Sequence, residues 1–480
     1  MLFSGNAYSL MMDRKVIAIG ASLLACLGRD IYAKLRIKRN AGVAKDKRIV
    51  ILGSGFAGVE AARELARLLP DKDNGEIVLV SKHDYLLFTP MLTEAVGGGI
   101  QPHHIIVPLQ SYPRFKRVKR VIGEVKGIDL HTRTISLEGA ETDKITADQL
   151  IICLGSTSNY HHVPGAEQNA VTMKTLEDAE GVRQSALALI KAATNEQDKE
   201  QRKAMLTFVV AGGGYTGVET IAALNDLVRE TISTYTELDK SEVQMIIAEP
   251  AGRLMGEVSP DLASYSQKQL ERAGIRVLLK TGVKSAGNGA VELSNGERIQ
   301  TRTFIWTAGV EPNTLTMQLD APKGHSKGLK VNNCFVLENY SGVWAVGDDA
   351  DVPKPDGKGS YGATAQNALR EGKLAARNIV RSLKGEPLQP FTYKPIGQLA
   401  LVGRYRGVAL VYGFKFSGLT AWAMWRAVYW AKMPSVKQKI RVLIDWCMDL
   451  LLEPVGVSDF VTVPPARRQT VENAKKLAAS

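Results

Sequence analysis

The stretch Gly53-Ser-Gly-Phe-Ala-Gly-Val-Glu60 decides the fold of this chain. It follows the apolar run Arg48-Ile-Val-Ile-Leu52 and leads into a helical pattern from Ala57 to Leu69. Glycines in the spacing G-x-G-x-x-G let the backbone turn tightly and approach a pyrophosphate, which the helix N-terminus then attracts. The chain repeats the signature as Gly212-Gly-Gly-Tyr-Thr-Gly-Val-Glu219 after Leu206-Thr-Phe-Val-Val-Ala211. Two such units predict two dinucleotides held face to face, with electrons passing between them.

The residues that end the second strand of each unit distinguish the two predicted nucleotide sites. A Rossmann unit usually carries an acid there, and its carboxylate accepts a hydrogen bond from the ribose 2′-hydroxyl. The first unit has Ser81-Lys82 followed by Asp84, whereas the second unit ends in Glu249. Because a carboxylate repels a 2′-phosphate, Glu249 favours NAD(H) over NADP(H), although Arg253 nearby weakens the preference. We expect a different adenosine clamp, using Ser81, in the first unit.

Composition narrows the class of protein. A chain of 480 residues has room for two or three domains. Its net charge of +12 favours an anionic partner such as nucleic acid, anionic lipid or a nucleotide. The four cysteines (26, 153, 334 and 447) are scattered, which indicates reduced thiols in a reducing compartment. Neither they nor the seven histidines form a metal-binding pattern, so we expect no metal site.

The two ends of the chain differ from its middle. Within residues 1–46, Val16 to Leu27 is an apolar run of 12 residues flanked by basic residues. A membrane-spanning helix needs about 20 such residues, so we interpret the segment as an N-terminal surface helix, with a mitochondrial-type targeting segment as the alternative. The polar stretch 195–203 is predicted to be a surface loop, and residues 466–480 a disordered tail.

The alternation of apolar runs and helical patterns predicts an α/β fold with two Rossmann-like dinucleotide-binding domains. Besides the strands that precede the two glycine turns, we expect strands at 76–80, 120–128, 133–137, 150–155, 243–248, 304–307 and 343–346. The stretch 394–409 alternates less clearly.

The C-terminal region is predicted to be amphipathic and membrane-binding. Two helical segments, Leu419–Met433 and Ser435–Leu452, hold four of the six tryptophans and the basic residues Lys437, Lys439 and Arg441. Aromatic and basic residues together suit helices that lie in the plane of a membrane interface, where each basic residue contributes about 1 kcal/mol near anionic lipid. The alternative is that these helices cover the core or form a dimer interface.

Further segments carry a resemblance to one known family. They are Asp84-Tyr-Leu-Leu-Phe-Thr-Pro-Met-Leu92, Leu150-Ile-Ile-Cys-Leu-Gly-Ser156, Ile305-Trp-Thr-Ala-Gly309 with Pro312-Asn313, Ala345-Val-Gly-Asp-Asp349, Ala363-Thr-Ala-Gln-Asn-Ala-Leu-Arg-Glu-Gly372, Gly397-Gln-Leu-Ala400, Val402-Gly-Arg404 and Phe414-Lys-Phe-Ser-Gly418. With the two glycine turns, they make residues 47–460 resemble a type II NADH dehydrogenase. This family comprises single-subunit NADH:quinone oxidoreductases of the two-dinucleotide-binding flavoprotein fold.

The resemblance implies a division of the chain and two cofactors. Residues 47–165 and 301–400 are expected to bind FAD, residues 166–300 to bind NADH, and residues 401–465 to anchor the protein to a membrane. The expected FAD contacts are Gly53, Gly55, Phe56, Ala57, Gly58, Ser81, Lys82, Thr89, Val125, Gly155, Asp348 and Gln366. The expected NADH contacts are Gly212, Gly214, Tyr215, Thr216, Gly217, Glu249 and Gly309.

The resemblance also implies an activity, the transfer of a hydride from NADH to FAD and of two electrons to a membrane quinone, without proton pumping. Gln366 has an amide that can donate to and accept from a quinone carbonyl; its alternative role is a cap or core amide. Glu219 is expected to tune the flavin or to pass protons, with Lys415 as its charge partner. The alternative is that Glu219, like Glu60, is only a first-turn acid stabilised by about 0.3–1 kcal/mol through the helix dipole. Arg370 replaces a second glutamine common in this motif.

Three other functions remain possible for this sequence. A sulfide:quinone oxidoreductase needs cysteines beside the flavin, but Cys153 and Cys334 do not match that family's positions. A disulfide reductase needs a cysteine pair after the first turn, and residues 53–92 contain none. A nucleotide-responsive scaffold is a third alternative, although no basic cluster interleaved with aromatic residues predicts nucleic-acid binding.

The expected partners and location follow from the same resemblance. We expect ubiquinone or menaquinone as the electron acceptor, a homodimer, and no nucleic acid. We expect peripheral attachment to the cytoplasmic face of a bacterial inner membrane, with the mitochondrial inner membrane as the alternative.

Overall fold

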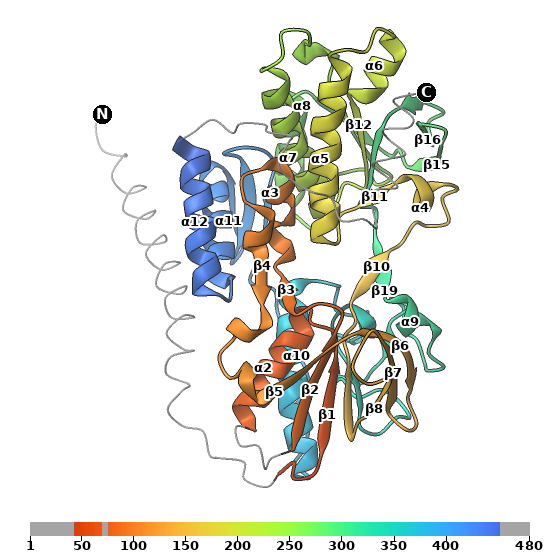
Figure 1. The fold of residues 1–480 in the computed structure, drawn as a ribbon, viewed down its shortest axis with the longest axis vertical. Helices are drawn as coiled ribbons and strands as arrows, with labels where there is room; N and C mark the ends of the chain where they lie inside the picture. Colours follow the sequence, from red (N-terminus) through yellow and green to blue (C-terminus); the bar gives the residue numbers. More distant parts are fainter. Residues whose placement is uncertain (1–42, 70–74, 452–480) are drawn as a thin grey trace, which may run out of the picture.

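The computed structural model describes residues 43–69 and 75–451. Its lower half in Figure 1 contains a parallel five-stranded sheet in the order β21-β9-β1-β2-β5. These strands are β21 (Val343–Ala345), β9 (Gln149–Ile152), β1 (Arg48–Leu52), β2 (Glu76–Ser81) and β5 (Val118–Ile122). Four of the five residues of β1 are buried, as expected for a central parallel strand covered on both faces.

Two helices pack together against this first sheet. They are α2 (Phe56–Leu68), which follows the first glycine turn, and α10 (Ala365–Leu383). A Cβ added at Gly372 of α10 would lie 2.1 Å from the carbonyl oxygen of Ala57, so only glycine permits this close approach of the two helices. The antiparallel sheet of β6 (Glu124–Asp129), β7 (Thr134–Glu138) and β8 (Lys144–Thr146) follows β5 in the chain.

A second parallel sheet forms the upper half, in the order β11-β18-β12-β13-β14. Its strands are β11 (Val171–Thr172), β18 (Thr303–Trp306), β12 (Thr207–Ala211), β13 (Gln244–Glu249) and β14 (Ile275–Leu279). The helices of this half are α5 (Leu176–Ala193), α6 (Lys199–Met205), α7 (Tyr215–Ile232) and α8 (Pro260–Arg272). A small antiparallel sheet is formed by β15 (Val283–Gly287), β16 (Ala290–Leu293) and β17 (Arg298–Gln300).

The two halves are joined by a two-stranded antiparallel ribbon. Its strands, β10 (Ser156–Ser158) and β19 (Val310–Pro312), carry the chain out to the second sheet and back again. Because β18 still belongs to the second sheet, the return crossing lies at β19, later than the boundary at residue 301 that we expected.

The C-terminal region packs directly against α7 and α8 of the second half and against the short helical turn Pro102–Ile105 of the first half. It consists of β23 (Gly397–Leu401), β24 (Gly407–Val411) and β25 (Phe414–Gly418), followed by α11 (Leu419–Lys432) and α12 (Val436–Leu451). In Figure 1, α3 (Leu92–Gly97) lies between these helices and the second sheet. Trp425 and Trp446 are buried in the same hydrophobic core as α3, α5 and α7, so these two tryptophans are packing residues rather than part of a membrane-facing belt.

Several local predictions need correction. The strand expected over 120–128 is two strands, because Gly123 separates β5 from β6. The loop expected over 195–203 is wrong in its second part, where the side chain of Asp198 caps the N-terminus of α6. The surface helix expected within residues 1–46 and the tail 466–480 lie outside the described residues, apart from 43–46. Among the described helices, none has the length and apolar character needed to cross a bilayer.

Candidate functional site

A cavity of about 1690 Å³ lies between the two halves and is lined by both glycine turns. The first turn contributes Gly55, Phe56 and Ala57, and the second contributes Gly214, Tyr215 and Thr216. Further lining residues come from the segment Phe88-Thr89-Pro90, from the β10–β19 ribbon region, from the start of α10 and from α11. The topology thus brings both turns, more than 150 residues apart in the chain, to one space.

The first glycine turn is shaped for a phosphate group. Gly53 has a φ of 109°, and a Cβ on Gly58 would lie 1.9 Å from the carbonyl oxygen of Gly53, so neither position tolerates a side chain. Gly55 caps α2 without a side-chain hydrogen bond, and open space faces its missing Cβ. The free backbone N–H groups at this helix end therefore face a space that an anion can fill.

The second glycine turn has the same geometry. Gly212 has a φ of 99°, and a Cβ on Gly217 would lie 1.9 Å from the carbonyl oxygen of Gly212. Gly214 caps α7, again without a side-chain hydrogen bond and with open space at its missing Cβ. The carboxylate of Glu249 accepts hydrogen bonds from the backbone N–H groups of Gly213 at 2.6 Å and Ala251 at 2.7 Å, which places it directly beside this turn.

The strand-end residues of the first unit lie outside the cavity lining. The hydroxyl of Ser81 donates to the carbonyl oxygen of His83 at 2.7 Å. Lys82 is exposed and lies 3.8 Å from Glu124, and Val125 lies in β6. The structure therefore does not bring Ser81, Lys82 and Val125 into the space between the turns, although Thr89, Gly155, Asp348 and Gly309 all line it.

A polar cluster surrounds Asp348 at the end of the first sheet. Ser156 donates to the Asp348 carboxylate at 2.6 Å, and the ammonium of Lys174 donates to the Ser156 hydroxyl at 2.6 Å. Burial lowers the pKa of Lys174, while Asp348 and Asp178 oppose that shift. This cluster fits a polyhydroxyl chain, because it combines an acceptor, a hydroxyl and a cation on one cavity wall.

Two buried acids hold the backbone around this cluster, and sequence reasoning gave them no role. Asp349 accepts from the N–H of Gly155 at 2.8 Å, and Glu371 accepts from the N–H of Gly347 at 2.7 Å. Burial raises the pKa of each carboxyl to about 7. Both residues belong to motifs quoted from the sequence, whereas Lys174 comes from a segment without any motif.

Gln366 lines the cavity with both ends of its amide engaged. Its Nε2 donates to the carbonyl oxygen of Gly397 at 3.2 Å, and the hydroxyl of Tyr393 donates to its Oε1 at 2.9 Å. The guanidinium of Arg370 lies 4.0 Å from the centre of the Tyr393 ring. Gln366 is thus held by the segment that contains Tyr393 and Gly397. Arg370, one turn later in the same helix, takes part through Tyr393 and through a hydrogen bond to the Gln366 carbonyl oxygen.

The expected pairing of Lys415 with Glu219 is wrong. The Lys415 ammonium lies on exposed β25 and forms an ion pair with Asp261 at 2.9 Å. A different lysine, Lys432 at the end of α11, lines the cavity, and desolvation together with nearby Arg370 lowers its pKa. Sequence reasoning missed Lys432, because it lies among the basic residues of the C-terminal helices and no motif distinguishes it from them.

Glu219 lies deep in the protein, where α7 meets the C-terminal region. Its Oε1 accepts hydrogen bonds from the backbone N–H of Leu401 at 2.9 Å and from the indole N–H of Trp425 at 3.2 Å. Burial raises its pKa to about 8, against the hydrogen bonds from Leu401, Trp425 and Thr93, while Glu94 adds to the increase. At neutral pH this carboxyl therefore holds a proton beside the cavity.

The matched acids of the two glycine units have different surroundings. Each is the fifth residue of its helix, beyond the first turn, so the expected helix-start role is wrong for both. Glu60 forms a two-point ion pair with Arg63, at 2.7 and 2.9 Å. Glu219 has no cation of this kind among the residues that the structure describes, and instead accepts from two N–H donors.

Of the three cysteines within the described residues, none offers an exposed thiol to the cavity. Cys153 packs beneath the first turn, where a Cβ on Gly58 would lie 3.0 Å from its Sγ, and burial raises its pKa well above the usual value. Burial also raises the pKa of Cys334. Neither thiol has the environment of a reactive cysteine, which is partly exposed and electropositive.

Comparison with known proteins supplies the family. Residues 47–372 match the family model described as pyridine nucleotide-disulphide oxidoreductase, and residues 396–453 match the model of the NDH2 C-terminal domain. A type II NADH:quinone oxidoreductase of Staphylococcus epidermidis is 30% identical over 385 residues, covering 78% of this chain and 92% of that protein. An external alternative NADH-ubiquinone oxidoreductase of Yarrowia lipolytica mitochondria is 27% identical, covering 83% of this chain and 78% of that protein.

Solved structures share the fold. NDH2 from Plasmodium falciparum in complex with NADH superimposes with a TM-score of 0.79 at 18% identity, covering 86% of this chain and all of that chain. The sulfide:quinone oxidoreductase of Aquifex aeolicus has a TM-score of 0.63 at 17% identity, covering 85% of this chain and 96% of that chain.

Proposed function

Because the chain belongs to the pyridine nucleotide-disulphide oxidoreductases and, among them, to the type II NADH:quinone oxidoreductases, we infer that it oxidises NADH and reduces a quinone without pumping protons. It carries FAD and uses NADH. The single observation that carries this inference is the opening of two equivalent, Cβ-free helix N-termini on one cavity. FAD, when bound, accepts a hydride from the nicotinamide and passes two electrons to the quinone.

The two turns divide the cofactors between them in this proposal. Gly53, Gly55 and Gly58 hold the FAD pyrophosphate, and Asp348 binds its ribityl chain with Ser156 and Lys174 behind it. The first-sheet residues, 47–165 and those after the β19 crossing, form the FAD domain. The second sheet forms the NADH domain.

The NADH site in this proposal is centred on Gly212, Gly214 and Gly217, with Tyr215, Thr216 and Gly309 at the cavity wall. Glu249 stays the residue that favours NADH over NADPH. Its two backbone hydrogen bonds fix the carboxylate next to the turn, which supports a contact with the adenosine ribose.

The quinone site in this proposal is the wall formed by Gln366, Tyr393 and Lys432, with Arg370 packed on the Tyr393 ring. The hydroxyl of Tyr393 is held by Gln366, and Lys432 supplies a cation whose lowered pKa favours proton donation. Lys432, rather than Lys415, is therefore the lysine that we assign to the active site. Glu219, protonated at neutral pH, is the acid that supplies a proton inside the protein.

Membrane attachment is peripheral, and we assign it to the outer face of α12. Gln438, Val442 and Trp446 face inward, whereas the large apolar side chains that are exposed on α12 are Val436, Ile440, Leu443, Ile444, Met448, Leu450 and Leu451. Lys437 and Arg441 flank this face, and the net charge of +12 suits anionic lipid. Lys439 is engaged elsewhere, since its ammonium donates to the carbonyl oxygen of Ala431 at 2.8 Å.

The remaining expectations stay proposals. They are the homodimer, the choice of quinone, and the cytoplasmic face of a bacterial membrane, with a mitochondrial inner membrane as the alternative. A sulfide:quinone reaction finds no support in the buried thiols of Cys153 and Cys334.

Stopped-flow absorbance of the purified holoenzyme tests the function. Mixing with NADH is expected to bleach the flavin band, and subsequent mixing with a soluble quinone analogue is expected to restore it. Bleaching that quinone does not reverse contradicts the quinone assignment. A flavin band that NADH leaves unchanged contradicts the NADH assignment.

A further inference from the structure

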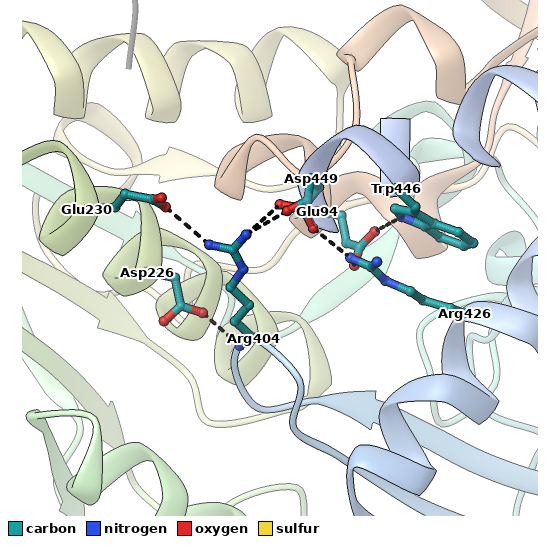
Figure 2. A network of polar contacts seen from close by, with 7 residues as sticks. All are labelled: Glu94, Asp226, Glu230, Arg404, Arg426, Trp446 and Asp449. Atoms are coloured by element: carbon teal, nitrogen blue, oxygen red, sulfur yellow. Dashed lines mark hydrogen bonds and ion pairs between the residues drawn. The ribbon is translucent and has the colours of Figure 1, made fainter. Parts of the chain in front are cut away.

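A second, smaller cavity of about 80 Å³ meets the large one at Glu219 and Thr93, which line both. Its walls come from α3, α7, the turn after β23, α11 and α12. Figure 2 shows the polar side chains of this region, with Arg404 and Arg426 pointing toward Asp449. A cavity needs only about 10–15 Å³ to hold one water molecule, so this one has room for several.

One face of α7 leads from Glu219 to the protein surface. Asp226 and Glu230 follow Glu219 by seven and eleven residues, so the three acids share one side of the helix and span about 16 Å. Ala222 and Ala223 lie between them and leave the cavity open. At the outer end, the side chains of Glu230 and Arg404 are 31% and 32% exposed.

The cavity contains more carboxyl groups than cations. Its lining residues include two guanidinium groups, of Arg404 and Arg426, and five carboxyl groups, of Glu94, Glu219, Asp226, Glu230 and Asp449. Arg229 and Arg406 also act on Asp226 from outside the lining. The lining itself still has more acids than cations, and burial favours the protonated form of the inner acids. Burial raises the pKa of Glu94 and of Asp226, in agreement with this count.

Arg426 is a buried residue of the cavity wall. The residue is 8% exposed, and its Nη2 lies 3.2 Å from Asp449 and 3.5 Å from Glu94. Its Nε and Nη1 have no acceptor among the described residues. The guanidinium carbon lies 4.3 Å from the centre of the Trp422 ring and 4.8 Å from the centre of the Trp446 ring, so two aromatic rings and two acids hold Arg426 in place at the cavity wall.

The reaction needs a proton that NADH does not carry. NADH, a quinone and one proton give NAD⁺ and a quinol, because the hydride brings two electrons and one hydrogen while the second hydrogen comes from the solvent. The large cavity is occupied by the cofactors and the quinone during turnover. A separate route for the solvent proton therefore has a clear use.

We propose that the small cavity is the proton-uptake route of the enzyme, which carries protons from the surface at Glu230, through water and Asp226, to Glu219. This inference rests on the proposed function. A proton from water restores the Glu219 carboxyl after the carboxyl has given its own proton to the reaction. Arg404 and Arg426 are positioning residues that hold Asp449 and Glu94 around the water.

The environment of Glu219 is defined on every side. The titratable and charged groups around it and its small cavity are Glu94 of α3, Tyr215, Asp226, Arg229 and Glu230 of α7, Arg404 and Arg406 after β23, Arg426 and Tyr429 of α11, and Asp449 of α12. Within this set, Asp226 is the acid that lies between Glu219 and Glu230 along the face of α7.

Two kinds of variant test the route. Gly99 lines the cavity, and a Cβ placed there would meet only Asp449, at 3.9 Å. The series Gly99→Ala, Gly99→Val and Gly99→Leu therefore fills the cavity in steps. Asp226→Asn removes the intermediate acid without changing its size, and Glu271→Gln, on exposed α8, is the matched control for loss of a carboxyl.

Two readouts are made on the holoenzyme. The first is the steady-state rate of quinone reduction, measured in H₂O and D₂O. The second does not depend on turnover: the infrared band of the protonated Glu219 carboxyl, assigned by its loss in Glu219→Gln, is followed as it exchanges after transfer to D₂O. Flavin content and thermal unfolding show which variants are folded.

We expect Asp226→Asn and Gly99→Leu to slow both quinone reduction and exchange of the Glu219 band by about tenfold or more, with a larger solvent isotope effect. A positioned acid contributes about 10²–10⁴-fold to a reaction rate. The loss expected here lies at the lower end of this range or below it, because only the supply of the proton to that acid is slowed. The loss is expected to grow from Gly99→Ala to Gly99→Leu, and Glu271→Gln is expected to match the wild type.

The proposal is overturned if Asp226→Asn and the largest folded Gly99 variant exchange and turn over like Glu271→Gln, because the proton then enters through the large cavity. Failure of the proposed function looks different. In that case the wild-type protein itself does not reduce quinone with NADH, whatever the exchange rate of the Glu219 band.

Discussion

The indole N–H of Trp425 donates a hydrogen bond to Oε1 of Glu219 over 3.2 Å and thereby ties the C-terminal helix α11 to the nucleotide-binding helix α7. The two residues are 206 positions apart in the chain. The same carboxylate oxygen accepts from the N–H of Leu401 at 2.9 Å. The helix that precedes the proposed membrane-binding helix α12 is therefore in direct contact with the acid that we assign to proton transfer.

The activity of Glu219 variants should depend on pH in a specific way. The pKa of Glu219 is raised to about 8, so its carboxyl is protonated below this pH and loses its proton above it. If Glu219 donates a proton, quinone reduction falls as the pH rises through about 8. Glu219→Gln is expected to lower the rate by about 10²-fold or more and to remove this limb. Glu219→Asp is expected to restore part of the rate, and a full rate in Glu219→Gln contradicts the role.

The free energy of unfolding should also depend on pH because of the raised pKa of Glu219. Between the unfolded pKa near 4.5 and the folded pKa of about 8, the folded state binds the Glu219 proton more tightly than the unfolded state. Its contribution to stability is therefore complete below pH 4.5 and is lost as the pH rises to 8, with a slope of at most about 1.4 kcal/mol per pH unit. Denaturant unfolding across this range is expected to show a shallower decline in Glu219→Gln than in the wild type. Equal slopes contradict the raised pKa.

The two glycine turns allow a matched pair of substitutions. In Gly58→Ala and in Gly217→Ala, the new Cβ lies 1.9 Å from a carbonyl oxygen, of Gly53 and of Gly212 respectively. Gly58→Ala is expected to lose most of its bound flavin. Gly217→Ala is expected to keep its flavin but to bind NADH at least about tenfold more weakly. Flavin absorbance per protein and NADH titration separate the two, and the opposite pattern means that the cofactors are assigned to the wrong turns.

The sequence and the structure point to different lysines for the active site. Lys432 lines the cavity near Arg370, whereas Lys415 is paired with Asp261 on the surface. Lys432→Gln is expected to lower kcat for quinone by about tenfold or more while leaving the bleaching of the flavin by NADH unchanged. Lys415→Gln is the matched control, and its effect on quinone reduction is expected to stay within about twofold, because exposed ion pairs contribute about 0–1 kcal/mol. A larger loss in Lys415→Gln than in Lys432→Gln reverses the assignment.

The outer face of α12 is expected to bind anionic lipid. Ile440 and Ile444 are 55% and 56% exposed on this face. The double substitution Ile440→Asp/Ile444→Asp is expected to weaken partition into anionic vesicles by at least about tenfold, which corresponds to about 1.4 kcal/mol. Ile122→Asp, at a 42% exposed isoleucine of β5, serves as the control. If the double variant instead changes a dimer into a monomer and still binds vesicles, the face is an interface between two copies.

The sequence by itself determined the two nucleotide-binding units and the family. Each unit depends on neighbouring residues, since a buried parallel strand, a glycine turn and a helix start are written within about 20 positions of each other. The close approaches at Gly58 and Gly217 follow from this local geometry. The parallel pairing of the two strands in each βαβ unit was also predictable from the alternation of strands and helices, because parallel neighbours connect through helices.

Only the tertiary structure decided which side chains meet. Sequence reasoning paired Glu219 with Lys415, but the packing of α11 against α7 gives Glu219 the N–H of Trp425 and leaves Lys415 to Asp261. It overlooked Lys432 and Lys174, which reach the cavity from segments without motifs. The acids that surround the small cavity come from α3, α7 and α12, more than 350 residues apart between Glu94 and Asp449. Contacts between distant segments depend on how whole elements pack, and no local pattern in a single sequence records that packing.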